Sequence, residues 1–121
     1  MQSLESWFSL IALFILCFTI IGGAATAFVR LFDINTPIDI GLLHGRAGVV
    51  GTLLLILSIV IGNETGQTIK PAIGFLTLTV LGGITLYFII RRKGILPRSI
   101  ILIHGALAIT AVHTLIFGFN I

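Results

Sequence analysis

Two histidines with the same local surroundings are the residues of this chain best suited to chemistry. His44 and His104 each precede a glycine and each stand seven residues after a proline. Imidazole can bind a metal, carry a proton or donate a hydrogen bond. Because both histidines lie in stretches that are otherwise almost uncharged, they are candidates for a functional site by default.

The composition indicates that these histidines lie in a membrane. The chain has 121 residues, of which 57% are hydrophobic and 9% are charged, whereas a soluble domain is about 45–50% apolar and about 25% charged. A water-soluble fold of this size would leave much of that apolar surface in water. We therefore expect an all-α membrane protein.

Four stretches are long enough to cross a bilayer core of roughly 30 Å, which takes about 20 helical residues. They are Trp7–Val29, Ile38–Gly62, Pro71–Ile90 and Ser99–Ile121. We predict one four-helix transmembrane bundle over residues 1–121, with no room for a separate soluble catalytic domain. The first stretch follows no basic residue and exceeds the apolar length of a signal peptide, so it is predicted to stay in the mature protein.

The charged residues predict the orientation of the bundle. An even number of spans places both termini on one side, with the loop between the second and third spans. That side carries Glu5, Glu64 and Lys70, and the other carries Asp33, Asp39, Arg30, Arg46, Arg91, Arg92, Lys93 and Arg98. Since basic loops stay in the cytoplasm, both termini are predicted to be extracytoplasmic, in a membrane of the bacterial inner-membrane type.

The two halves of the chain also match each other in a single register. Residues 12–56 align with residues 72–116 without a gap, and 13 of these 45 positions are identical, against roughly four or five expected from composition. The identical pairs include glycines, prolines and histidines, whose types have positional meaning. We therefore predict two tandem two-helix repeats, over about 7–62 and 67–121.

The repeat places the histidines in one layer with two glycine pairs. Each histidine is about 10 Å along its helix from the preceding proline, and the pairs Gly22-Gly23 and Gly82-Gly83 reach about the same depth. Two imidazoles facing across a two-fold axis suit bis-histidine ligation of a haem iron in a four-helix bundle. The glycines would let a flat macrocycle approach the backbone.

The resulting hypothesis is a membrane b-type cytochrome that holds one haem b per chain, with His44 and His104 as iron ligands and a role in electron transfer. Arg46 is predicted either to reach the lipid headgroups or to pair with a haem propionate. Two other functions remain open: a small channel or transporter with a histidine-lined site, and a cofactor-free accessory subunit of a membrane complex.

The segment Leu43-His44-Gly45-Arg46-Ala47-Gly48 resembles the His-x-x-x-Gly helix starts of transmembrane b-type cytochromes, including ferric-reductase-like membrane domains. In that family, four-helix bundles hold haem between histidines on two helices. The resemblance implies the same fold and cofactor here. Family members commonly bind two haems through four histidines, whereas this chain has three histidines.

The third histidine differs from the other two in its position. His113 has no repeat partner, because Leu53 occupies the equivalent position. It stands on nearly the opposite side of the same helix from His104, given the helical repeat of about 3.6 residues per turn, so it is predicted not to share the central site.

We expect contact with membrane lipid and none with nucleic acid, since no basic cluster is interleaved with aromatic residues. A homodimer or a redox partner protein remains open.

Overall fold

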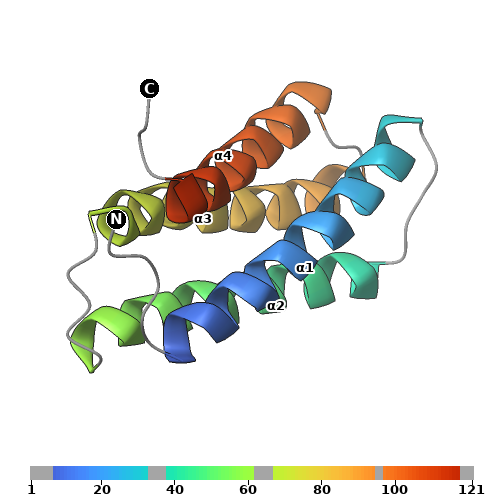
Figure 1. Ribbon diagram of the computed structural model, residues 1–121. Coiled ribbons are helices and arrows are strands. Elements are labelled where there is room, and N and C mark those ends of the chain that lie inside the picture. Colours follow the sequence, from blue (N-terminus) through green and yellow to red (C-terminus); the bar gives the residue numbers. More distant parts are fainter. Residues whose placement is uncertain (1–6, 33–37, 62–66, 95–96, 118–121) are drawn as a thin grey trace.

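The computed structural model describes residues 7–32, 38–61, 67–94 and 97–117, and these residues form four helices (Figure 1). They are α1 (Trp7–Leu31), α2 (Ile38–Val60), α3 (Ile69–Lys93) and α4 (Arg98–Phe117). All four are long and apolar enough to cross a membrane. The predicted all-helical fold with four candidate membrane spans is therefore confirmed.

The residue types at the loop between α3 and α4 explain where α3 ends and α4 begins. α3 continues beyond the apolar stretch to Lys93, where cations are favourable near the negative end of the helix dipole. Gly94 then adopts φ +70°, and its N–H donates to the carbonyl of Ile90 at 2.9 Å, which is a left-handed helix cap suited to glycine. Pro97 immediately precedes α4, and its carbonyl accepts the N–H of Ile100 at 3.2 Å. Pro37, the equivalent proline before α2, lies outside the described residues.

The four helices form two hairpins that pack side by side (Figure 1). α1 packs mainly against α2, and α3 packs mainly against α4. Smaller contacts between α2 and α3 and between α1 and α4 join the hairpins, which leaves α2 and α4 as a diagonal pair. We call the end of the bundle where α1 and α3 finish and α2 and α4 begin the arginine end, because Arg30, Arg91, Arg92 and Arg98 lie there.

The bundle is tightly packed in only one half, the half away from the arginine end. The buried apolar side chains of this core are Ala12, Leu16, Leu55, Ile69, Ala72, Leu76, Ala111, Val112 and Leu115. Among the described residues, Ile101 is the only buried one in the half nearer the arginine end. The four helices are therefore held together mostly at one end, and the other half has a less buried interior.

Equivalent residues of the internal alignment have the same burial in this core. Ala12 and Ala72 are both 0% exposed, and Leu55 and Leu115 are 0% and 2% exposed. Leu16 and Leu76 match as well, at 3% and 4%. These three aligned pairs are therefore equally buried in the two hairpins.

Candidate functional site

The two sequence-predicted histidines meet inside the bundle. His44 on α2 and His104 on α4 each lie six residues after the first residue of their helix, which is about 9 Å from the arginine end. Their ring centroids are 6.2 Å apart, and the ring planes are inclined by 81°. Two side chains from the diagonal helix pair thus bridge the less buried half of the bundle.

The ring of His44 is oriented by α1. Its Nδ1 lies 3.0 Å from the backbone carbonyl oxygen of Thr19. A carbonyl can only accept, so Nδ1–H is the donor, and in the neutral ring Nε2 keeps a free lone pair. A carbonyl partner on one ring nitrogen is the usual way in which a metal-binding histidine is fixed in orientation. The Thr19 carbonyl is therefore suited to hold His44 as a ligand.

The ring of His104 is held less completely. Its Nδ1 is buried but has no hydrogen-bond partner among the residues that the structure describes. The carbonyl of Thr79, which is equivalent to that of Thr19 in the internal alignment, makes no hydrogen bond to this nitrogen. A buried polar atom without a partner is unfavourable, so His104 is the more adjustable of the two side chains.

Three of the four predicted glycines lie directly against the imidazole rings. A Cβ atom at Gly23 would lie 2.6 Å from Cε1 of His44, and a Cβ at Gly83 would lie 3.2 Å from Cε1 of His104. At Gly82 the nearest atom would be Nδ1 of His104, at 3.4 Å. These glycines therefore make room for the histidine rings themselves, whereas the sequence predicted that they make room for a macrocycle.

Gly22 and Arg46 lie apart from the histidine pair. Apart from its chain neighbours and the backbone of its own helix, no atom of the described residues lies within 4 Å of a Cβ placed at Gly22, so this position faces open space. Arg46 is exposed, and the helical repeat puts it on nearly the opposite side of α2 from His44. Contact of either residue with a cofactor stays a prediction.

The spacing of the histidine pair can be tested against the cofactor predicted from the sequence. Since a metal–imidazole bond is about 2 Å long and the ring centre lies about 1 Å behind the bonded nitrogen, two imidazoles on opposite sides of one metal have centroids about 6 Å apart. The observed separation is 6.2 Å. By the separation of their centres alone, the two rings could therefore hold one metal between them, and the less buried half of the bundle is the half that would have to admit a macrocycle.

The same residues do not form a complete site for a bare metal ion. In the described segments, no group of three or more His, Cys, Asp or Glu side chains lies together. Protein sites for zinc usually supply three or four such ligands. A metal held by His44 and His104 would therefore need its other ligands from outside these residues, as a macrocycle would supply them.

His113 is separate from the central site, as predicted. It is exposed on α4, and its ring centroid lies 5.2 Å from that of Phe117, one turn further along the helix. Its position nearer the end of α4 puts it beside the well-packed core rather than beside His44.

The Thr19 carbonyl is a functional group that the sequence did not indicate. Backbone acceptors carry no residue-type signal, but Thr19 and Thr79 are one of the identical pairs of the internal alignment. Both threonine hydroxyls donate to the carbonyl four residues earlier, at 2.8 Å. The match between Thr19 and Thr79 is the sequence signal that could have indicated an equivalent role for this helical turn in both hairpins.

Comparison with protein-family models, with characterised proteins and with solved structures found no match for the chain. Its function must therefore be inferred from the histidine pair and from the helices that position it.

Proposed function

We propose that the chain is a membrane b-type cytochrome in which His44 and His104 hold one haem b for electron transfer. The observation that carries the proposal is the 6.2 Å separation of the two rings from diagonal helices. The orientation of His44 by a backbone carbonyl and the glycines against both rings support it.

Each part of the chain has a role in this proposal. The Thr19 carbonyl accepts the Nδ1 proton of His44, so Nε2 would be the atom left to bind the haem iron. Gly23 and Gly83 let the two rings stand close to α1 and α3. The tightly packed half of the bundle fixes the helices, and the less buried half accommodates the cofactor between them.

Haem bound by two histidines supplies one-electron transfer and leaves no open axial position for oxygen. The protein then contributes position and tuning of the potential. The apolar surroundings of the pair and the arginines at the nearer end of the bundle are the features of this chain that would set that potential.

The membrane orientation and the duplication belong to the same proposal. We infer that the chain arose from two tandem hairpins, because equivalent residues of the internal alignment share identity and burial. The arginine end would face the cytoplasm by the positive-inside rule, both termini would be extracytoplasmic, and the histidines would lie nearer the cytoplasmic face.

Two rival functions make different use of the same pair. Imidazole rings at this distance and angle also pack well against each other without a ligand, as in a cofactor-free accessory subunit. A histidine pair could also carry protons or bind an ion in a small channel or transporter.

A reduced-minus-oxidised absorption spectrum of the purified protein separates these functions. The proposal predicts the sharp difference bands of a low-spin b-type haem. A colourless protein from cells supplied with haem would contradict it. Proton or ion flux in liposomes without bound haem would favour the channel, and neither signal would favour the accessory subunit.

A further inference from the structure

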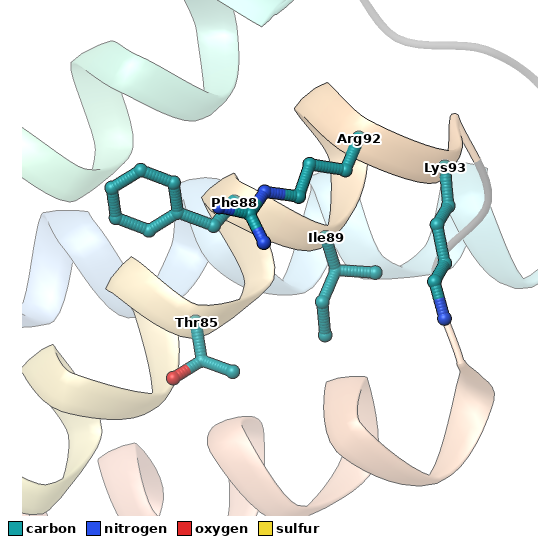
Figure 2. Close-up of a pocket in the computed structure, with 5 residues that line it drawn as sticks. All are labelled: Thr85, Phe88, Ile89, Arg92 and Lys93. Atoms are coloured by element: carbon teal, nitrogen blue, oxygen red, sulfur yellow. The ribbon is translucent and has the colours of Figure 1, made fainter.

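A groove lies on α3 near the arginine end, away from the histidine pair. It has a volume of about 310 Å³ and is lined by Thr85, Phe88, Ile89, Arg92 and Lys93 (Figure 2). Phe88 and Ile89 supply apolar walls. The Arg92 side chain reaches toward Phe88, and the Lys93 side chain lies on the other side of Ile89 (Figure 2). The hydroxyl of Thr85 donates a hydrogen bond to the carbonyl of Leu81 at 2.9 Å, so the groove is apolar except at its two cations.

The groove faces the surroundings of the bundle rather than its interior. Gly83 marks the inner side of α3, because it lies against the ring of His104. The helical repeat puts Phe88 and Arg92 on the side of α3 that is turned away from Gly83. Phe88 is 53% exposed. In a membrane, this face of α3 contacts lipid.

The depth of the groove matches the boundary between acyl chains and headgroups. The apolar stretch Pro71–Ile90 spans about 30 Å, the thickness of a bilayer core. Arg92 and Lys93 follow it directly, so they lie at headgroup level. Phe88 and Ile89 lie just below, at the level of the upper acyl chains.

The two cations of the groove are available for an anionic partner. Arg91 donates to the hydroxyl of Tyr87 at 3.0 Å and lies over its ring, whereas Arg92 and Lys93 have no hydrogen bond or ion pair within the described part of the chain. Asp39 is the only acidic side chain in that part. Charge complementarity therefore favours an anion that also has an apolar portion.

We propose that this groove is a binding site for one anionic phospholipid, with its phosphate attracted by Arg92 and Lys93 and an acyl chain against Phe88 and Ile89. The site is independent of haem. The two cations favour a negatively charged headgroup, and the apolar walls favour a ligand with a lipid tail.

Native mass spectrometry of the detergent-purified protein with added phosphatidylglycerol or phosphatidylcholine tests the proposal. We expect tighter binding of phosphatidylglycerol. Each cation near the membrane surface contributes about 1 kcal/mol to attraction of anionic lipid, so Arg92→Gln with Lys93→Gln should weaken binding roughly 20-fold or more. Arg91→Gln is the matched control on the same turn. It removes one cation that does not line the groove, so it should weaken binding much less than the double substitution.

A second variant separates a shaped site from general surface charge. Ile89→Trp fills the groove and keeps both cations, and we expect it to weaken phosphatidylglycerol binding while helix content by circular dichroism is unchanged. Inorganic phosphate should not displace the lipid. Equal binding of the two lipids, equal loss in the Arg91→Gln control, full binding by Ile89→Trp, or displacement by inorganic phosphate would each overturn the proposal.

Discussion

The imidazole of His44 lies 6.2 Å from that of His104, although the two helices that carry them are diagonal in the bundle and do not pack directly on each other. The two side chains thus meet in a part of the interior where the backbones of α2 and α4 do not pack against each other. This relationship makes the pair a candidate for a shared ligand and gives the following predictions.

Replacement of either histidine should remove the proposed cofactor. We expect His44→Ala and His104→Ala each to lose the low-spin haem spectrum, because one imidazole cannot fill both axial positions. Glycine variants at the same positions should regain the spectrum when imidazole is added. The measurement is the haem-to-protein ratio with the absorption spectrum, and an unchanged spectrum in either alanine variant would contradict bis-histidine ligation.

The two positions of the first glycine pair should respond differently. Gly23→Ala places a methyl group 2.6 Å from the His44 ring, and such overpacking costs about 1–3 kcal/mol. We therefore expect weaker haem binding and a lower melting temperature in detergent.

Gly22→Ala is the matched control for this substitution. No described atom lies within 4 Å of the new methyl group, and alanine favours a helix over glycine by about 1 kcal/mol. This variant should bind haem normally with unchanged or higher stability. If both variants lost haem equally, the contact between Gly23 and His44 would not be the cause.

Arg46→Ala should retain haem. The side chain is exposed and lies on another side of α2 than His44, so it does not support the ring. The haem-to-protein ratio should equal that of the parent, with any effect confined to redox potential or lipid preference. Loss of haem in this variant would show that Arg46 has a direct role at the site.

His113→Ala should also keep the full haem content. His113 is exposed and contacts Phe117, and it lies on nearly the opposite side of α4 from His104. A stoichiometry above one haem per chain in the parent, reduced to one in this variant, would instead indicate a second haem held by His113 across a dimer.

The sequence predicted the number and type of the helices because long uncharged stretches have one stable backbone arrangement in lipid. The helix boundaries were less accurate. The third helix was predicted to end at Ile90, but it continues to Lys93 and is capped by Gly94. Terminal cations are compatible with a helix end, and glycine suits the left-handed cap.

The meeting of His44 and His104 could also be predicted, since both lie in one layer of the internal alignment. The rotation of each helix about its own axis could not be predicted. These helices are apolar on all sides, so no polar face marks the side that is turned to the outside of the bundle. This is why the sequence did not separate Gly23, which contacts His44, from Gly22, which does not. The way the helices pack side by side decides which of two neighbouring residues faces the interior.

The most direct test of the central claim is the haem stoichiometry and spin state of the purified parent, measured by absorption and electron paramagnetic resonance beside the double variant His44→Ala/His104→Ala. The account predicts one low-spin haem per parent chain and none in the double variant. A parent chain without haem, or a double variant with the same low-spin haem, would contradict it.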